Sequence, residues 1–233
     1  MASNQITLFD LPTRMMLNFK GVDYKTEWLE YPDIKPRLEK HLQLPAGKEV
    51  YTIPTVILPD GTYLEDSLAI AHKLEELYPE PKLAGIETPT WERLTRDLLP
   101  GIMGDLRPVY FSRLPERVLN KASYEYWQTT RREALGVNKR PDELTDADRD
   151  DTWKQLADSG KLKQVTALLN ANEKGPLFGE QVAFVDFVWA GFLVFWRTIG
   201  GAEWDKILEL TGDKERHLKF LEAMEPYAKR NSF

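Results

Sequence analysis

Cysteine is absent from this chain of 233 residues, and histidine is scarce. Without cysteine there is no disulfide, no thiol nucleophile and no thiolate ligand for a metal ion. The three histidines are His41, His72 and His217, and none has a second histidine four residues away. Because histidine-rich zinc sites commonly use such a pair, the sequence predicts no metal centre.

An excess of basic charge and a long apolar run are also missing. The formal net charge is −6, and acidic residues outnumber basic ones in both halves of the chain. Nucleic acid and anionic membranes attract basic surfaces, so we expect neither as a partner. The most apolar window, residues 182–200, contains Asp186 and is too short to span a bilayer comfortably. The N-terminus lacks the pattern of a secretory signal, so we expect a cytoplasmic protein.

The sequence does contain the composition and patterning of a soluble globular protein, with 42% hydrophobic and 29% charged residues. In the first 80 residues, runs rich in β-branched and aromatic residues alternate with helical apolar spacing. Strand patterns cover residues 6–11, 22–31, 55–58 and 62–65, and helical patterns cover 13–21, 33–44 and 66–78. We therefore predict the order β-α-β-α-β-β-α, with a hairpin turn at "PDG".

A change of pattern follows this first part. Residues 79–90 are rich in proline and lack apolar periodicity, which is typical of a linker between domains. From Trp91 onward every strong signal is helical. We therefore predict an α/β domain over residues 1–81 and an all-α domain over residues 91–233.

Several details of the helical part are also predicted. The first long helix should be interrupted at Pro100 and Pro108, because proline lacks the N–H that a helix interior needs. Thr145 should cap an amphipathic segment that reaches residue 172. A hydrophobic helix is expected over about residues 184–199, with Trp189, Phe192 and Trp196 in the core, and two amphipathic helices follow it.

Ile53 and Pro54 stand at the start of the third predicted strand. Proline cannot donate to a sheet ladder, so it belongs at a strand start, an edge or a turn. The structural interpretation is an ordinary trans bond at a sheet edge, since cis bonds before proline are uncommon. The functional interpretation is a cis bond that turns the backbone N–H and C=O of Ile53 toward a ligand.

Asp66 and Ser67 open the helix that follows the hairpin, directly after Glu65. The structural interpretation is helix capping, because a side-chain oxygen there accepts from free backbone N–H groups. The functional interpretation is that the N–H groups and the serine hydroxyl bind a ligand carboxylate, while Asp66 binds an ammonium group. An α-amino acid head group carries both charges and fits this pair of neighbours.

Taken together, "YTIPTVI", "PDG" and "DSLAIAHKLEELYP" resemble the glutathione-binding half of the glutathione S-transferase superfamily. "LNFKGVDYKTEWLEYPDIKP" and "FGEQVAFVDFVWAGFLVFW" look most like fungal soluble transferases related to bacterial β-etherases. The resemblance covers nearly the whole chain. It implies a thioredoxin-like N-terminal domain, an all-helical C-terminal domain and a role in detoxification. It also implies a homodimer formed through the helix of residues 66–78 and the long helix from Trp91.

The same resemblance implies glutathione as co-substrate or ligand, with the Ile53 backbone on its cysteinyl unit and Asp66 and Ser67 on its γ-glutamyl head. In the family, a Ser, Cys or Tyr near the start of the first helix stabilises the glutathione thiolate. Here "LFDLP" runs directly into "TRMMLNFKG", which is about one and a half helical turns shorter than the fungal pattern. Thr13 is the nearby hydroxyl, either as the catalytic group or as a helix cap.

Three further residues complete the predicted sites. Relatives usually have Ser or Thr three residues before the aspartate of the hydrophobic helix, but this chain has Ala183 before Asp186. We expect Asp186 to accept from backbone N–H groups, with the lost side-chain cap costing about 1 kcal/mol. Tyr110 and Phe111 are candidates for lining the site of an apolar or phenolic acceptor.

Three functions stay open at this stage. The first is a glutathione transferase acting on small hydrophobic or aromatic electrophiles. The second is a non-catalytic binding protein that keeps the fold and a ligand cleft. The third is a glutathione-dependent ether-cleaving enzyme or isomerase. The sequence does not separate them, because acceptor specificity resides in loops and pocket shape.

Overall fold

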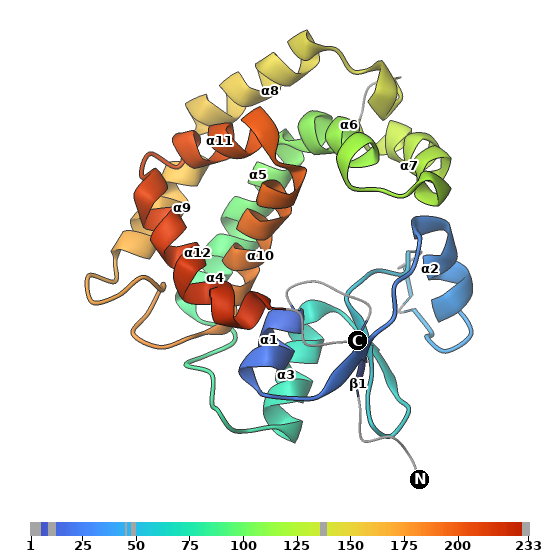
Figure 1. The fold of residues 1–233 in the computed structure, drawn as a ribbon, viewed down its shortest axis with the longest axis vertical. Coiled ribbons are helices and arrows are strands. Elements are labelled where there is room, and N and C mark those ends of the chain that lie inside the picture. Colours follow the sequence, from blue (N-terminus) through green and yellow to red (C-terminus); the bar gives the residue numbers. More distant parts are fainter. Residues whose placement is uncertain (1–5, 9–12, 45, 48–49, 136–138, 230–233) are drawn as a thin grey trace.

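The computed structural model describes residues 6–8, 13–44, 46–47, 50–135 and 139–229. Within these ranges the chain forms a small half that contains a sheet and a larger helical half (Figure 1). The first half has the element order β-α-β-α-β-β-α that the sequence predicts. No helix in the described ranges is both long and apolar enough to cross a membrane.

Four short strands form one sheet in the order β2-β1-β3-β4. The elements of this half are β1 (Ile6–Leu8), α1 (Thr13–Phe19), β2 (Tyr24–Thr26), α2 (Tyr31–Leu38), β3 (Thr55–Ile57), β4 (Tyr63–Glu65) and α3 (Ser67–Leu77). β1 and β2 are parallel, while β1 with β3 and β3 with β4 are antiparallel. The β3–β4 hairpin therefore forms one edge of a mixed sheet.

Alternation along β3 divides this half into two layers. The side chain of Val56 is fully buried in the large core that includes α1 and α3. Its neighbour Ile57 instead packs with Ile34 and Leu38 of α2. Successive side chains of a strand point to opposite faces. Helices α1 and α3 therefore cover one face of the sheet and α2 covers the other, as Figure 1 shows.

The helical half begins at Pro89 and runs to Ala228. Its elements are α4 (Pro89–Glu92), the π-helix η1 (Arg93–Leu98), α5 (Leu99–Asp105), α6 (Arg107–Arg117), α7 (Lys121–Ala134), the 3-10 helix η2 (Pro141–Glu143), α8 (Asp146–Ser159), α9 (Lys161–Asn170), α10 (Phe184–Ile199), α11 (Gly201–Leu210) and α12 (Lys214–Ala228). The prediction that this part is helical throughout is confirmed.

The interruption predicted at Pro100 is a change of helix type. Before this proline the backbone is π-helical, and the N–H of Leu99 donates to the C=O of Leu94, five residues back. Pro100 has no N–H to donate, and its ring needs space where an α-helix would place a carbonyl. The wider π turn supplies that space. The second interruption lies at Leu106, just before Pro108, and separates α5 from α6.

The segment predicted from Thr145 to residue 172 is two helices. Thr145 caps α8 as predicted, since its Oγ1 accepts from the N–H of Asp148 at 3.3 Å. Gly160, with φ of 63°, then ends α8, and α9 starts at the next residue. A left-handed glycine is a common helix terminator, because it carries no Cβ to clash.

Helix α10 forms the centre of the helical half and contacts α6, α11 and α12 (Figure 1). Its bounds agree with the predicted range 184–199. Trp189 and Trp196 are fully buried, and Phe192 is buried beside them. Their assignment to the core is confirmed.

Asp186 lies in the first turn of α10 and is fully buried. Its carboxylate accepts from the N–H of Phe178 at 3.0 Å and from the N–H of Ala183 at 2.8 Å. Burial raises the pKa of Asp186 to about 6, although these backbone bonds oppose the shift. The carboxylate therefore fixes the loop before α10 to the start of the helix, which is the structural role expected of it.

Replacing Ala183 with serine is expected to stabilise the protein by about 1 kcal/mol. Ala183 occupies the cap position of α10 in an extended conformation and offers no side-chain acceptor. A serine hydroxyl there can accept from the N–H of Asp186, which now donates to the backbone C=O of Ala183 at 3.0 Å. Urea unfolding at neutral pH measures the gain. A loss of stability would show instead that this buried position has no room for the hydroxyl.

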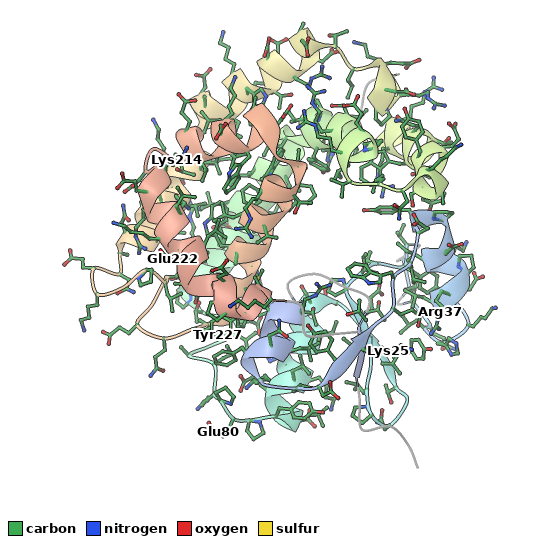
Figure 2. All side chains as sticks on the ribbon, in the orientation of Figure 1. Lys25, Arg37, Glu80, Lys214, Glu222 and Tyr227 are labelled. Atoms are coloured by element: carbon green, nitrogen blue, oxygen red, sulfur yellow. The ribbon has the colours of Figure 1, made fainter. Side chains whose placement is uncertain are left out.

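The two halves are joined by a contact between α1 and the end of α12. Asn18 Nδ2 donates to the C=O of Tyr227 at 2.7 Å and to the C=O of Lys229 at 2.5 Å. The ring of Tyr227 packs edge-on against Phe19, and Figure 2 places this tyrosine beside α1. Tyr24 OH donates to Asn18 Oδ1 at 3.0 Å and so orients the amide.

Candidate functional site

The register of the hairpin brings together two pairs of residues that are distant in sequence. Thr55 pairs with Glu65 across β3 and β4. Ile53 lies two residues before Thr55, and Asp66 directly follows Glu65. The predicted ligand residues Ile53, Asp66 and Ser67 therefore lie at the same end of the hairpin. The Ile53–Pro54 peptide bond is cis, which agrees with the functional interpretation and not with the trans alternative.

Glu65 connects the two segments at this end of the hairpin. Its Oε1 accepts from the backbone N–H of Thr52 and, at 2.6 Å, from the Thr52 hydroxyl. The hydroxyl of Thr55 donates to the C=O of Thr52 at 2.9 Å. These bonds hold the backbone directly before Ile53 against the start of α3. The sequence shows an acid at position 65, but its partner follows only from the strand register.

Asp66 caps α3 from an unusual backbone conformation. Its Oδ1 accepts from the N–H groups of Leu68 and Ala69, each at 3.0 Å. Its φ is 83°, and it is the one residue other than glycine in the described ranges with a positive φ. Such a conformation costs about 1–3 kcal/mol and is often found at functional sites. The predicted capping role of Asp66 is confirmed.

Polar groups remain available at the start of α3. Asp66 is exposed and Ser67 is half-buried. Within the part of the chain that the structure describes, Asp66 Oδ2 and the Ser67 hydroxyl have no hydrogen-bond partner. A carboxylate oxygen and a hydroxyl thus stand side by side at a helix N-terminus. This set can bind an ammonium group and a carboxylate together.

A cavity of about 330 Å³ lies between the two halves, next to Ile53. Its walls come from α2, from the segment before β3 and from α7, which faces α2 in Figure 1. The lining residues are Tyr31, Ile34, Lys35, Val50, Tyr51, Thr52, Ile53, Tyr126 and Arg131. Its volume suits a small organic molecule. This cavity is not lined by the other predicted site residues, which are Asp66, Ser67, Thr13, Tyr110 and Phe111.

Thr13 is the first residue of α1, and its side chain is 1% exposed. Its hydroxyl has no hydrogen-bond partner among the residues described. Residues 9–12, with the short connection predicted to have lost the catalytic Ser or Cys, lie outside the described ranges. Thr13 therefore lies at the start of α1, where the family places its catalytic hydroxyl or thiol, but its own hydroxyl is buried and not open to solvent.

The aromatic pair on α6 lies beside the core. Phe111 is buried, and its C=O accepts from Trp127 Nε1 at 2.9 Å. Tyr110 is half-buried, and burial raises the pKa of its hydroxyl while Arg107 acts in the opposite direction. The ring of Tyr110 also contacts Phe195 edge-on, with the centroids 5.9 Å apart. The pair thus packs between Trp127 of α7 and Phe195 of α10.

Arg131 is a cavity residue that the sequence analysis did not identify. Its guanidinium carbon lies 4.5 Å from the ring centroid of Trp127, 5.6 Å from that of Tyr31 and 6.0 Å from that of Phe111. In the sequence it is one of several basic residues in an amphipathic helix. Its position depends on α7 packing against α2, which no local pattern reveals.

No group of three or more metal-binding side chains occurs within the described ranges. The site is instead built from a hairpin edge, a capped helix and a cavity that faces the helical half. A mixed four-stranded sheet of this topology, followed by an all-helical half, is the thioredoxin-like arrangement with a helical C-terminal domain.

The chain belongs to the glutathione S-transferase family. The family model of the glutathione S-transferase C-terminal domain matches residues 92–227, and that of the N-terminal domain matches residues 10–77. The chain is also similar to the glutathione S-transferase-like protein ustS of Aspergillus flavus. The two are 27% identical over 229 residues, which covers 89% of this chain and 80% of the relative.

Solved structures of two fungal transferases are similar over nearly the whole chain. Glutathione transferase GSTFuA3 from Phanerochaete chrysosporium is 28% identical, with a TM-score of 0.78 over 97% of this chain and 98% of that one. A glutathione S-transferase of Ceriporiopsis subvermispora, crystallised in complex with glutathione, is 25% identical, with a TM-score of 0.80 over 99% and 100%. The predicted family is confirmed, as is the predicted similarity to fungal transferases.

Proposed function

We propose that the protein binds glutathione and transfers it to small hydrophobic or aromatic electrophiles. The Ile53 backbone holds the cysteinyl unit, and Asp66 and Ser67 hold the γ-glutamyl head. The observation that carries this proposal is the pairing of Thr55 with Glu65, which sets these residues at one end of the hairpin. The complex of the Ceriporiopsis relative with glutathione supports the same ligand. Two domains, over residues 1–81 and 91–233, form the cleft.

Calorimetry with glutathione tests the binding step. Folded protein is expected to bind glutathione at millimolar concentration or below, with oxidised glutathione and the isolated γ-glutamyl amino acid as comparison ligands. Glutathione turnover with an aryl halide then tests the transfer step. Absence of any binding by folded protein would refute the proposal.

A second function, ligand binding without catalysis, is favoured by the burial of Thr13. Its hydroxyl is the nearby candidate for thiolate stabilisation, yet its side chain is only 1% exposed. A thiolate needs a donor within hydrogen-bond distance to lower its pKa. If Thr13 does not reach the sulfur, glutathione and hydrophobic ligands bind but no transfer follows.

Replacing Thr13 with valine separates the two functions. Valine has nearly the same shape, and removing an unpartnered buried hydroxyl is expected to leave stability unchanged or slightly higher. For a transferase, the ultraviolet absorbance of bound thiolate should appear near neutral pH in the wild type and shift to higher pH in Thr13→Val, with a slower turnover. Equal thiolate titration and turnover no faster than in buffer for both proteins would establish the binding function instead.

The cellular and quaternary properties are proposed on family grounds alone. A cytoplasmic homodimer that acts in detoxification fits a transferase of this type. The dimer would form through α3 and the first helices of the helical half, where Leu77 is 42% exposed. Sedimentation of wild type and Leu77→Glu tests the interface, because a buried charge there would favour the monomer.

A further inference from the structure

The cavity beside Ile53 is positively charged although the protein as a whole carries a charge of −6. Arg131 on α7 and Lys35 on α2 stand on opposite walls, and none of the lining residues is acidic. Neither cation forms an ion pair with any residue in the described part of the chain. The cavity therefore offers uncompensated positive charge to whatever enters it.

Three acids next to residues of this cavity accept hydrogen bonds from other groups. Glu65 accepts from the N–H and the hydroxyl of Thr52, which lines the cavity. Glu30, next to Tyr31, accepts from Asn120 Nδ2 at 2.6 Å and from the Ser123 hydroxyl. Glu125, next to Tyr126, accepts from Arg140 at 3.0 and 3.1 Å. Within the described part of the chain, no ion pair joins Arg131 to Glu30 or Glu125. The charged side chains that line the cavity are therefore both basic, and the Glu65 carboxylate lies on Thr52 at its edge.

Arg131 is also held in one place. Its guanidinium lies over the Trp127 ring and is flanked by Tyr31, and its Nη1 donates to Thr130 Oγ1 at 3.1 Å. Contacts with aromatic faces orient an arginine without neutralising it. A guanidinium fixed in this way loses little freedom when it binds a carboxylate through two parallel hydrogen bonds.

We propose that Arg131 selects acceptor molecules that are aromatic carboxylates, with the carboxylate on the guanidinium and the ring among Tyr31, Tyr126 and Ile53. This proposal rests on the proposed function, in which Ile53 carries the cysteinyl unit of glutathione. Arg131 lies on the helical half, across the cavity from Ile53. The acceptor therefore binds between Arg131 and the glutathione held at Ile53. The guanidinium on α7 thus adds a requirement for negative charge to an acceptor site that aromatic residues alone would leave apolar.

Two kinds of ligand could place a carboxylate on the Arg131 guanidinium, namely an aromatic acid and glutathione itself. The γ-glutamyl head is assigned to Asp66 and Ser67, outside the cavity. The glycyl carboxylate of glutathione is the other group that could bind in the cavity. Lys35 on α2 is a cation available to it, since it lines the cavity from the same half as the hairpin. A test must therefore measure glutathione and an aromatic acid separately on the same proteins.

The test compares para-nitrobenzoate with para-nitrobenzamide, which has nearly the same shape but no charge. Calorimetry measures each ligand against wild type, Arg131→Gln, Arg131→Lys and Arg132→Gln, with and without saturating glutathione. Arg132 is the matched control, since it is exposed on the same helix, does not line the cavity and gives the same change of charge. Circular dichroism confirms that each variant is folded.

Wild type is expected to prefer the acid over the amide by about tenfold or more, as a charge-assisted bidentate contact predicts. Arg131→Gln should remove most of this preference, Arg131→Lys should retain part of it, and Arg132→Gln should retain all of it. Equal binding of acid and amide to wild type, or a preference that survives in Arg131→Gln, would overturn the proposal.

Glutathione titrations separate failure of this proposal from failure of the proposed function. Arg131→Gln is expected to bind glutathione within about twofold of wild type, because its assigned ligand is the acceptor. If Arg131→Gln loses glutathione affinity while the preference for the acid stays, Arg131 serves glutathione and the proposal is overturned. If wild type binds no glutathione, the proposed function fails, and the comparison of acid with amide still decides the role of Arg131.

Discussion

Replacing Asp66 with asparagine is expected to weaken glutathione binding about tenfold or more while leaving thermal stability nearly unchanged. Asparagine keeps an oxygen that can accept from the N–H groups of Leu68 and Ala69, and it tolerates the positive φ of 83°. What it loses is the negative charge that the proposed site uses for the γ-glutamyl ammonium group. A hydrogen bond to a charged group contributes about 1.5–3 kcal/mol, which corresponds to at least a tenfold change in affinity.

Two further variants identify the cause of the loss. Asp66→Ala removes the cap and the charge together, so it is expected to lower both affinity and stability, the latter by about 1 kcal/mol. Ser67→Ala removes a neutral hydroxyl and should cost less affinity than Asp66→Asn. Calorimetry and thermal melts of the three proteins distinguish these effects. Wild-type affinity in Asp66→Asn would show that Asp66 only caps the helix.

His217 is expected to destabilise the protein by about 3 kcal/mol as the pH falls from 6.5 to 4. The histidine is fully buried, and burial lowers its pKa from 6.5 to about 4, with Arg216 acting in the same direction and Asp213 against it. Trp189 Nε1 donates to His217 Nδ1 at 3.1 Å, so the neutral ring carries its proton on Nε2, 2.8 Å from Thr166 Oγ1.

The sign follows from the two pKa values. Between pH 6.5 and 4 the unfolded chain binds a proton at His217 that the folded protein does not bind, so stability falls with falling pH. Above pH 6.5 the ring is neutral in both the folded and the unfolded state, so His217 causes no loss of stability there. Asp186, whose folded pKa of about 6 exceeds its usual 3.8, acts in the opposite direction over nearly the same range. The two buried groups therefore largely compensate each other in the wild type.

Urea unfolding across this pH range isolates the histidine. In His217→Gln the contribution of Asp186 remains, so the variant should become more stable as the pH falls from 6 to 4, unlike wild type. His72→Gln is the matched control, because the side chain of His72 is 52% exposed. The same pH profile for wild type and His217→Gln would contradict the prediction, whatever their difference at neutral pH.

The elements that local patterns specify were predictable from the sequence. The continuous apolar run of α10 fixed both of its ends, and the turn residues of "PDG" fixed the hairpin, in which Gly61 has a φ of 86°. The strand pattern of residues 22–31 was less accurate, since among the residues that the structure describes only Tyr24–Thr26 pair with β1. A strand ends where its partner ends, and the partner is not a local property.

Other features depend on contacts that a sequence pattern does not contain. Pro115 lies within α6, which ends where the N–H groups of Val118 and Leu119 both donate to the C=O of Leu114, and α7 starts at Lys121. Glu65 reaches Thr52 only because the strand register places the two residues together. Arg131 lines the cavity only because α7 packs on α2. The candidate residues of the site were predictable by resemblance, whereas their neighbours were not.

The contact of Asn18 with the end of α12 bears on how the protein is made. The amide and its partner Tyr227 are 209 residues apart, so the ribosome must add all of the intervening residues before they can meet. The first half can form its sheet earlier, but α1 acquires this support last. The start of α1, where Thr13 lies, should therefore become fully ordered only after Tyr227 has been synthesised, and glutathione should protect a nascent chain less before that point than after it.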